Sequence, residues 1–505
     1  MEQGKRIRSV ILHFLIYLGF FILVHININA NIIHVPDDYP TIQMAIDTAD
    51  SGDTILVAPG IYPENVNISK DHLSLLSQYV NTGDTSIISQ TIIEGDMSTY
   101  ALYISGYQSE VNGFTVRNGQ GGVTASGMVY LKNMIVRDNE YIAWQCTAAG
   151  IRLHNFTGIM ENVEIKNNLG NYYGGGVSAM YCTAVFRNVN IHDNTCYTMG
   201  GGIYSRDSEI TIINSVIDNN SGNFGGGLDL AEDNDFTFVN TVISNNWGSK
   251  GGGLHIMYSK ATFINSTVVN NVSNWEGSGF WSRASTQVIF NSIFHNNESI
   301  DIAFNSMYDP SNCYIAYSNI QDGIDSIMTY NNCNLYWMDG NIDVDPLFKD
   351  PSMGGWALLD ASECIGAGTD SIFADQTWVV SPEFDFYDTE RPCPQYSNVD
   401  LGAIENSHGT PVYLKENITS CGTKINVYPN PFTTTTTIEY ELTESSRVQL
   451  TIYSVTGETI YRIEEPMKSQ GKHSVTWTPD RLSQGLYIVE VVFDEYRVRE
   501  KLIVQ

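Results

Sequence analysis

Four Gly-Gly-Gly triplets divide the middle of this 505-residue sequence at nearly constant intervals. The triplets start 26, 25 and 26 residues apart, and an aliphatic residue follows each of them. A fixed period of this length is typical of a solenoid, in which each repeat packs only against its neighbours. No Gly-Lys-Ser/Thr follows the glycines, so a phosphate-binding loop is not indicated. The triplets begin at Gly174, Gly200, Gly225 and Gly251.

Two rows of asparagine run in step with the triplets, and the second row follows the first by six residues in every repeat. Asparagine tolerates the left-handed backbone conformation that sharp corners need, and stacked side-chain amides can hydrogen-bond along a repeat axis. We therefore expect both rows to form corners of a stack. The first row is Asn112, Asn133, Asn162, Asn188, Asn214, Asn240, Asn265 and Asn291, and the second is Asn118, Asn139, Asn168, Asn194, Asn220, Asn246, Asn271 and Asn297.

The residues around these rows follow a strand pattern and show no helical period. Apolar residues stand two positions before and three positions after the first asparagine of a repeat, as Ile212 and Ile217 do around Asn214. A turn-broken repeat of this kind fits one coil of a parallel β-helix, and the crossover preference of parallel strands makes the helix right-handed. The sequence thus predicts an all-β chain whose main part is a right-handed parallel β-helix solenoid, with repeats starting near residue 110.

Residues 35–68 are expected to cap the first coil. Ile42, Ala45 and Ile46 have helical spacing, and Thr41 is the expected N-cap of this helix. A short helix followed by strands would cover the exposed sheet edge at the solenoid end. The stretch TIQMAIDTADSGDTILVAPGIYPENVNI resembles the opening of pectin-lyase-like right-handed β-helix proteins, and this resemblance implies the same fold.

Two motifs mark the end of the predicted solenoid. DPLF at residues 345–348 opens an irregular stretch, and NVDLGAIEN at residues 398–406 ends it. Together they resemble the C-terminal closure of a bacterial family of exported β-helix proteins with interchangeable surface-anchoring tails. The resemblance implies a fold and indicates no chemistry.

Alternating strands separated by turn signals fill residues 425–505, which predicts a small immunoglobulin-like β-sandwich. YPNPF at 428–432, IYSVTG at 452–457, LSQGLY at 482–487 and KLIV at 501–504 resemble the type A C-terminal sorting domain of type IX secretion. The resemblance implies that the type IX secretion machinery exports the chain across the outer membrane of a Gram-negative bacterium, for release or attachment to a surface glycolipid. An ordinary immunoglobulin-like binding module is the alternative.

The N-terminus has the three parts of a secretory signal peptide. Basic residues at positions 5, 6 and 8 precede the apolar stretch Val10–Val24, which is short for a membrane span, and cleavage is expected after Ala30. We expect no transmembrane helix in the mature chain. The predicted organisation is a signal peptide over 1–30, a capped β-helix over 31–406, a linker over 407–424 and a sorting domain over 425–505.

The composition bears on partners and on redox state. The chain has 56 acidic and 26 basic residues and a formal net charge of −30, which argues against nucleic acid and anionic membranes as partners. The charge allows cations, including Ca²⁺, although the solubility of an exported protein also explains it.

Eight cysteines permit disulfides, and buried free thiols are the alternative. The first pairs to test are Cys313–Cys333 and Cys364–Cys393.

A patch of candidate ligand-binding residues follows from the strand expected after each triplet. Side chains alternate along a strand, so the second residue after each triplet should point outward. Aromatic rings there can stack on sugars, and an aspartate beside a histidine can share a proton. Outward strand positions are also polar or aromatic in proteins without a ligand. The candidate ligand-binding residues are Tyr204, Arg206, Asp229, His255, Trp281 and Arg283, of which Arg206, Asp229 and His255 are also candidate catalytic residues.

The motifs of known β-helix enzymes are absent from this predicted patch. Pectate lyases of this fold need several carboxylates around Ca²⁺, whereas Asp229 is the only acidic residue in the patch. The repeats lack the Gly-His-Gly and Arg-x-Lys motifs of galacturonan hydrolases, so no glycosidase carboxylate pair is visible. The densest acidic cluster in the repeats, Glu232, Asp233 and Asp235, is a candidate Ca²⁺ site, with a solvated loop as the alternative.

The sequence therefore predicts an exported protein, secreted or held at the outer cell surface, that presents a long side face to a glycan or another extracellular polymer. Binding or adhesion is the first hypothesis, a polysaccharide lyase or glycoside hydrolase is the second, and a non-catalytic structural protein is the third. The fold alone does not decide among them. An enzyme predicts several carboxylates, or carboxylates with Arg or Lys, in one groove, whereas a binder predicts a row of exposed aromatic side chains.

Overall fold

The computed structural model describes residues 30–141, 148–298, 300–351, 354–395, 397–410, 425–442, 445–454, 459–479, 483–493 and 496–504. The chain divides into two compact units, Met1–Tyr413 and Leu414–Gln505. The predicted signal peptide lies outside the described residues except for Ala30, and so does the predicted linker from residue 411 onward. Within the described ranges, no helix has the length and apolar character that a membrane span needs.

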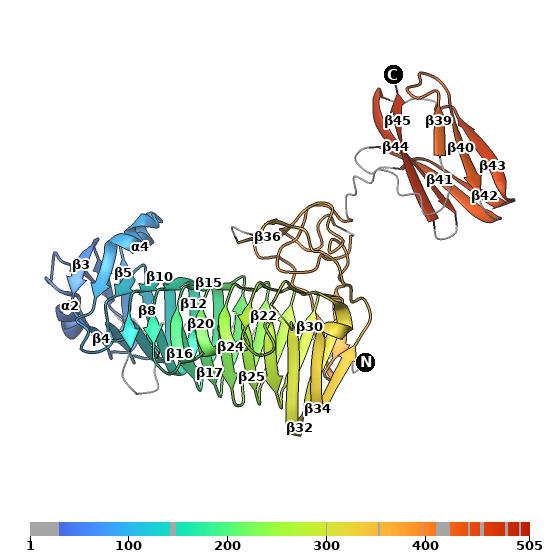
Figure 1. Cartoon of the computed structure of the whole chain (residues 1–505). Coiled ribbons are helices and arrows are strands. Elements are labelled where there is room, and N and C mark those ends of the chain that lie inside the picture. The colour runs from blue at the N-terminus through green and yellow to red at the C-terminus, as the bar shows by residue number, and fades with distance from the viewer. Residues whose placement is uncertain are drawn as a thin grey trace, which may run out of the picture. The chain divides into compact units, whose positions relative to one another are not determined.

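The first unit is a right-handed parallel β-solenoid of about 11 turns, which confirms the predicted fold. Each coil contributes three short strands to one continuous sheet, and each strand pairs in parallel with its counterparts in the neighbouring coils (Figure 1). The pairing starts at β1 (Ile32–Val35), so the predicted start near residue 110 was wrong. The first coils lack the asparagine and glycine markers by which the repeats were found.

The strands fall into three columns, joined by long strands that run through a corner. The first column holds β4 (Val66–Ile68), β7 (Leu102–Ile104), β14 (Val177–Met180), β17 (Ile203–Arg206), β21 (Leu228–Ala231), β25 (Leu254–Met257) and β29 (Phe280–Arg283). The second holds β1, β2 (Thr54–Val57), β5 (Ser74–Ser77), β8 (Ser109–Asn112), β18 (Glu209–Ile213), β22 (Asp235–Val239), β26 (Lys260–Ile264) and β30 (Thr286–Phe290).

The third column holds β3 (Gly60–Pro63), β6 (Thr91–Glu94), β9 (Thr115–Arg117), β19 (Val216–Asp218), β23 (Val242–Ser244), β27 (Thr267–Val269), β31 (Ile293–His295) and β33 (Asn319–Ile320). The long strands are β10 (Val123–Arg137), β12 (Ile151–Lys166), β15 (Thr183–His192), β32 (Ile302–Ala316) and β34 (Ile327–Trp337). A separate six-stranded sheet adds a fourth strand to several coils. It consists of β11 (Glu140–Tyr141), β13 (Leu169–Gly170), β16 (Thr195–Met199), β20 (Ser221–Phe224), β24 (Trp247–Lys250) and β28 (Val272–Ser273).

The interior of the solenoid is filled by alternate residues of the three columns. The first residue after each triplet is fully buried, as Ile203, Leu228 and Leu254 show. Aromatic rings stack from coil to coil in the same interior, with 4.9 Å between the ring centroids of Phe238 and Phe263. Since parallel coils are about 4.8 Å apart, the repeat period itself places equivalent apolar side chains in contact.

The first asparagine row forms a corner between the second and third columns. Seven of its eight residues, from Asn133 to Asn291, have positive φ, as predicted. The side-chain amides also bond from coil to coil, as Asn240 Nδ2 does to Asn214 Oδ1 at 2.9 Å.

The second asparagine row is a buried ladder. Six bonds of 2.9–3.1 Å, each from the Nδ2 of one asparagine to the Oδ1 of the next, run from Asn139 to Asn297. The predicted stacking of amides is therefore confirmed, but the predicted left-handed conformation is wrong in this row except at Asn118. The residue before each asparagine takes that conformation instead, as Asn219 does with a φ of 50°.

The glycine triplets lie at the corner that leads into the first column. The first glycine of each triplet has a φ of 64–69°, a left-handed conformation that costs glycine little. The second glycine lies against the next coil, because a Cβ atom on Gly226 would lie 2.5 Å from the carbonyl oxygen of Gly252. The triplets are thus corner residues, as expected.

The N-terminal cap has the predicted helix. α2 (Ile42–Thr48) buries Ile42, Ala45 and Ile46, and Thr41 Oγ1 accepts a hydrogen bond of 3.2 Å from the backbone N–H of Met44. Two further short helices, α3 (Tyr79–Thr82) and α4 (Ser86–Gln90), lie in the early coils, and the 3₁₀ helix η1 (Gly323–Ser326) precedes β34.

The second unit consists of two antiparallel sheets around a core of its own, consistent with the predicted small β-sandwich. One sheet holds β39 (Ile425–Tyr428), β40 (Thr436–Leu442) and β43 (Gly471–Trp477). The other holds β42 (Thr459–Lys468), β41 (Ser446–Ser454), β44 (Gly485–Phe493) and β45 (Tyr496–Val504).

The six cysteines among the described residues are all free thiols. The disulfides suggested for Cys313–Cys333 and Cys364–Cys393 are therefore not formed. Burial raises the pKa of Cys364 to about 12, so this thiol is protonated and unreactive at neutral pH. Cys146 and Cys421 lie outside the described residues.

Candidate functional site

The predicted patch on the first column points away from the apolar interior, as the alternation of strand residues requires. Tyr204, Asp229, His255 and Trp281 occupy equivalent positions on β17, β21, β25 and β29. Their exposed fractions are only 2–5%, so the expectation that they form an exposed surface was wrong. A polymer in solvent cannot reach these four side chains in this structure.

The residues before three of the four glycine triplets, Tyr173, Phe224 and Lys250, cover three of these side chains. Tyr173 stacks on Tyr204 with 4.0 Å between ring centroids, and the Phe224 ring lies 5.2 Å from that of His255. The ammonium group of Lys250 lies 3.5 Å from the centre of the Trp281 ring. Each covering residue belongs to the coil before the residue that it covers, so the repeat builds a second packed layer outside the first column.

Within this layer, Asp229 and His255 do form the predicted pair. His255 Nδ1 lies 2.9 Å from Asp229 Oδ1, and the His255 ring stacks on Trp281 with 5.0 Å between centroids. The thiol of Cys196 lies near this pair, and burial raises its pKa to about 11. The arrangement can hold a proton between neighbouring coils, but it has no access to a polymeric substrate.

Arg206 and Arg283, the other two patch residues, lie where the first column ends and are not part of the buried layer. Arg206 is 43% exposed and forms ion pairs with Glu232 and, at 3.2 Å, with Asp207. The Arg283 guanidinium lies 6.0 Å from the centre of the Tyr258 ring. The structure therefore divides the six predicted binding residues between two environments.

The candidate Ca²⁺ site at Glu232, Asp233 and Asp235 is not formed. Among the described residues, no group of three His, Cys, Asp or Glu side chains is placed to hold a metal ion. Glu232 is paired with Arg206, and Asp235 lies on β22 opposite Lys260 of β26. The three acidic side chains therefore do not converge on one point, because Glu232 is paired with Arg206 while Asp233 and Asp235 line a groove beside Lys260.

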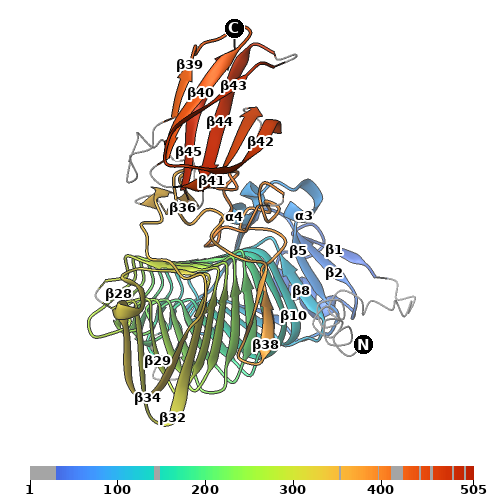
Figure 2. The same cartoon turned by 90° about the vertical axis from the view of Figure 1, so that its right-hand side faces the viewer.

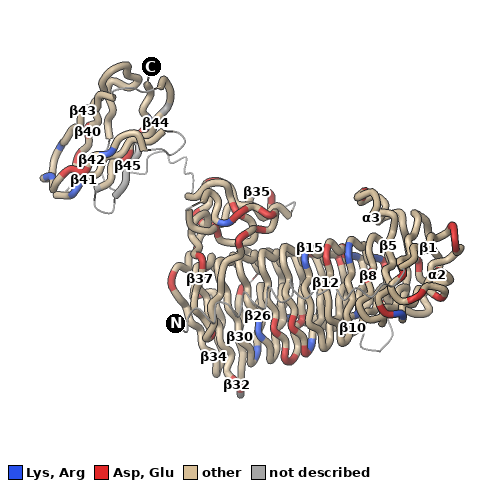
Figure 3. Tube along the Cα trace, turned by 180° about the vertical axis from the view of Figure 1, so that it is seen from behind, with Lys and Arg blue, Asp and Glu red and all other residues tan. Residues whose placement is uncertain are grey.

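A groove with acidic walls lies at the same turn, between the first and second columns. Its volume is about 560 Å³, and acidic positions gather there beside β26 (Figure 3). Glu209 and Asp235 are in register on adjacent strands, and burial raises the pKa of Asp235. Lys260 comes next in register and binds Asp375 at 2.9 Å. The charged residues that line the groove are Asp207, Glu209, Asp233, Asp235 and Lys260.

Residues 338–406 cover another face of the solenoid. This segment contains two short hairpins, β35 (Phe348–Asp350) with β36 (Gly355–Leu358) and β37 (Ser371–Ala374) with β38 (Thr377–Val380). Apolar side chains of the segment pack on the outside of the second and third columns, where Figures 1 and 2 both place it. These coils are therefore closed to a ligand on that side.

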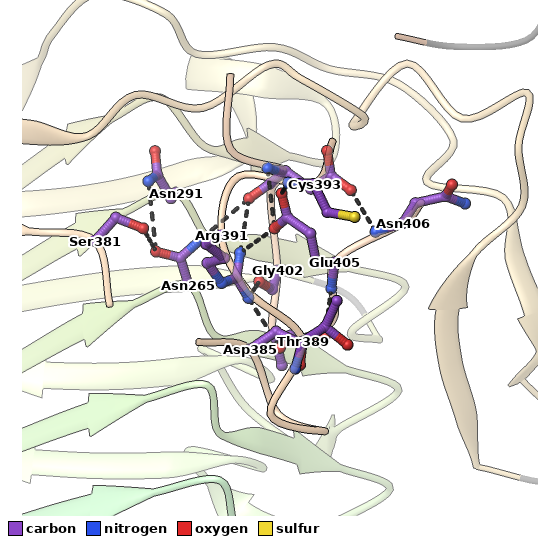
Figure 4. Close-up of polar contacts among 12 residues, drawn as sticks. Asn265, Asn291, Ser381, Asp385, Thr389, Arg391, Cys393, Gly402, Glu405 and Asn406 are labelled. Carbon is purple, nitrogen blue, oxygen red and sulfur yellow. Dashed lines mark hydrogen bonds and ion pairs between the residues drawn. The ribbon is translucent and has the colours of Figure 1, made fainter. Parts of the chain in front are cut away.

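A buried polar network fixes the segment to the first asparagine row (Figure 4). Arg391 Nη1 lies 2.7 Å from Glu405 Oε2, and both side chains are fully buried. Arg391 also donates to Asn240 Oδ1, and Asn265 Nδ2 donates to the backbone carbonyl of Asp400. Burial raises the pKa of Glu405, an effect that the Arg391 charge opposes. The NVDLGAIEN motif thus supplies residues that hold this segment on the solenoid, and all of them except the exposed Asn398 are buried.

The apolar side chains of the covering segment pack on the second and third columns, and the six-stranded sheet carries a row of exposed aromatic rings. Tyr197 of β16 is 61% exposed, Trp247 of β24 is 41% exposed, and Trp275 is 68% exposed. Trp275 lies beside β24, because its backbone N–H donates to the carbonyl of Ser249 at 3.2 Å. At about 4.8 Å per coil, the row extends over roughly 14 Å along the solenoid axis.

The strand segments that carry these rings contain few charged residues, and the carboxylate of Glu276 directly follows Trp275. Within residues 195–199, 221–224, 247–250 and 272–275, Lys250 is the only charged residue, and it is held against Trp281. The other side chains there that are at least partly exposed are the hydroxyls and amides of Thr195, Thr198, Ser221, Asn223, Ser249 and Asn274, together with the apolar Met199, Phe224 and Val272. The face thus offers flat apolar rings among neutral hydrogen-bonding groups.

Sequence reasoning missed this row because the residues between the second asparagine and the next glycine triplet were not read as strands. A usable signal was present. Trp247 directly follows Asn246 of the buried ladder, just as Thr195 follows Asn194 and Ser221 follows Asn220. Thr195, Ser221 and Trp247 pair in register, which confirms that they occupy equivalent positions in their coils.

Comparison with known proteins places two family models on the chain. Residues 122–279 match the right-handed β-helix region, and residues 426–505 match the secretion system C-terminal sorting domain. No curated protein matches the chain.

Among solved structures, a pectin methylesterase from carrot shares 11% identity and has a TM-score of 0.28, covering 62% of this chain and 89% of its own. An alginate lyase from Paenibacillus shares 12% identity with a TM-score of 0.25, covering 61% of this chain and 98% of its own. A pectin methylesterase from Erwinia chrysanthemi shares 11% identity with a TM-score of 0.25, covering 66% and 98%.

The matched sorting domain indicates export by the type IX system to the cell surface or the extracellular space. The matched repeat region agrees with the coils of the first unit. The chain is therefore an exported right-handed β-helix protein with a secretion system C-terminal sorting domain.

Proposed function

We propose that this exported β-helix protein binds a neutral polysaccharide through the outer face of the six-stranded sheet. The observation that carries the proposal is the row of Tyr197, Trp247 and Trp275, three exposed aromatic rings on three of four successive coils, with the coil of β20 between Tyr197 and Trp247. An aromatic ring presents a flat apolar surface, and the surrounding hydroxyls and amides can hydrogen-bond to sugar hydroxyls. In this role the protein retains or adheres to a glycan outside the cell.

Two features favour a neutral ligand over an acidic one. The protein has a formal net charge of −30, which repels a polyanion. The aromatic face also offers no free cation, because its single lysine, Lys250, lies against Trp281. The proposal assigns no ligand contact to Tyr204, Asp229, His255 or Trp281, because their side chains are buried.

Removal of either exposed tryptophan should weaken binding. We expect Trp247→Ala and Trp275→Ala each to raise the Kd for a neutral polysaccharide by tenfold or more, because aromatic anchors at a binding surface often contribute over 1 kcal/mol. The measurement is affinity electrophoresis and isothermal titration calorimetry of the secreted protein with xylan, mannan and mixed-linkage glucan. Polygalacturonate and alginate serve as acidic ligands, to which we expect no binding.

A matched control is available in the same unit. Trp378 is 62% exposed on β38, outside the six-stranded sheet, and Trp378→Ala should leave every affinity unchanged. Equal losses in the Trp378 and Trp275 variants, or unaltered affinity in all three, would contradict the assignment of the binding face.

The acidic groove favours a second candidate function, a glycoside hydrolase. Glu209 and Asp235 are in register on adjacent strands and both line the groove, and a pair of carboxyl groups in one groove is what a glycosidase needs. Desolvation in the groove raises the pKa of Asp235, which is the direction that suits a general acid, although the side chain is exposed. New reducing ends that appear during the binding screen, and that are lost in the Asp235→Asn variant, would favour this function.

A further inference from the structure

Asp53, at the start of β2, holds the beginning of the described chain. Its side chain is only 3% exposed. Asp53 Oδ1 accepts a hydrogen bond of 2.8 Å from the backbone nitrogen of Asn31, and Oδ2 accepts one of 2.8 Å from the backbone nitrogen of Asp50. The bond from Asn31 is the largest cause of a lowered pKa at Asp53, so the buried carboxylate is ionised at neutral pH.

The surroundings of this bond suit a cation better than a neutral amide. A cavity of about 450 Å³ opens beside it and is lined by the carboxylates of Asp38, Asp50 and Asp53, with no lysine or arginine among its lining residues. The nearby ammonium group of Lys70 is bound by the backbone carbonyls of Ile46, Asp47 and Ala49. The buried carboxylate thus meets the backbone nitrogens of Asn31 and Asp50, and of these two only that of Asn31 can become a chain-terminal ammonium group.

We propose that Asn31 is the first residue of the exported protein and that Asp53 binds its α-ammonium group. The proposal rests on the predicted signal peptide with cleavage after Ala30. Hydrolysis breaks the bond between the Ala30 carbonyl carbon and the Asn31 nitrogen, and the oxygen of water becomes part of the Ala30 carboxylate. The Asn31 nitrogen keeps its electron pair and is protonated to –NH₃⁺, while Asp53 stays ionised.

Removal of the signal peptide then strengthens the N-terminal cap of the solenoid. The bond from a neutral N–H to the carboxylate becomes an ion pair with a hydrogen bond, which adds the attraction between two opposite charges. The effect reaches the first coil, because the Asn31 carbonyl accepts from the backbone nitrogen of Thr54 and β1 pairs with β2 from Ile32 onward. A chain that retains residues before Asn31 has no charge at this position, and its cap should open more often.

The first test is the N-terminus itself. Mass spectrometry of the N-terminal peptide of the protein secreted by its native host should show Asn31 as the first residue. The α-amino group should titrate at least one unit above its ordinary pKa of about 8, measured by the pH dependence of its acetylation. A different first residue, or an ordinary α-amino pKa, would overturn the proposal.

The second test compares a protein that begins at Asn31 with one that keeps residues 27–30. Amide hydrogen exchange of residues 32–35 should be about tenfold slower in the first, because local opening must break the stronger bond. Asp53→Asn keeps an oxygen acceptor but removes the charge, and it should abolish the difference. Asp50→Asn, a matched loss of charge in the same cavity, should preserve the difference in exchange.

Equal exchange in the two proteins, or equal effects of the two substitutions, would contradict the proposed ion pair. The α-amino pKa of the unmutated protein decides the question should the Asp53 variant fail to fold.

Discussion

Replacement of Arg391 by alanine is expected to destabilise the β-helix unit by about 3–5 kcal/mol, the usual cost of removing one partner of a buried ion pair. The guanidinium lies 2.7 Å from Glu405 and is fully buried with it. Without Arg391, the Glu405 carboxylate would remain in the interior with no positive charge, and the carbonyls of Gly402 and Ala403 would lose a donor. The segment 338–406 should then detach from the asparagine corner.

Urea unfolding followed by circular dichroism and tryptophan fluorescence measures this loss. The control is Arg137→Ala, which removes a partly exposed ion pair with Asp138 and should cost less than about 1 kcal/mol. The double variant Arg391→Met with Glu405→Leu should be more stable than Arg391→Ala, because no unpaired charge remains. Similar stabilities for Arg391→Ala and Arg137→Ala would show that the ion pair does not hold the segment.

Replacement of Asn220 by alanine is the second large expected effect, about 3–5 kcal/mol, because several buried polar groups lose partners at once. Asn220 Oδ1 accepts from the backbone and side-chain nitrogens of Asn194, and its Nδ2 donates to Asn246 and to the carbonyl of Ile191. The substitution breaks the ladder in its middle, where neither solvent nor another side chain replaces the amide.

The neighbouring residue provides the control for this prediction. Asn219 is exposed and has a φ of 50°, a conformation that glycine adopts easily, so Asn219→Gly should change the free energy of unfolding by less than about 1 kcal/mol. Thermal and urea unfolding of the Asn219 and Asn220 variants measure the two changes in the free energy of unfolding. A cost at Asn219 as large as that at Asn220 would mean that the corner conformation, and not the ladder, stabilises the coil.

The sequence period allowed most of the fold to be predicted. Equivalent residues of successive coils must stack in a parallel solenoid, so the spacing of Gly200, Gly225 and Gly251 located the corners and the inward residues after them. The same spacing could not tell which asparagine of a neighbouring pair turns the backbone. Asn219 and Asn220 both tolerate the left-handed conformation, and only the coordinates show that the first turns while the second points inward.

The candidate site could be predicted less well, because strand alternation says which side chains leave the core and not what lies over them. Trp281 leaves the core as expected, yet Lys250 from the preceding coil covers it. In the same way, the sequence neighbours Glu232 and Asp235 suggested one metal site, while the turn directs one to Arg206 and the other toward Lys260. Such packing depends on contacts between coils, and the spacing of residues within one repeat does not reveal it.

Hydroxyl-radical footprinting of the secreted protein with and without a bound neutral polysaccharide tests the proposed binding face most directly. Exposed aromatic rings are oxidised readily, and a ligand stacked on them shields them. We predict protection of Tyr197, Trp247 and Trp275, with unchanged oxidation of Tyr181, which lines the acidic groove, and of the buried Tyr204 and Trp281. Protection of Tyr181 alone, with the three rings of the six-stranded sheet unaffected, would contradict the proposal and move the ligand to the acidic groove.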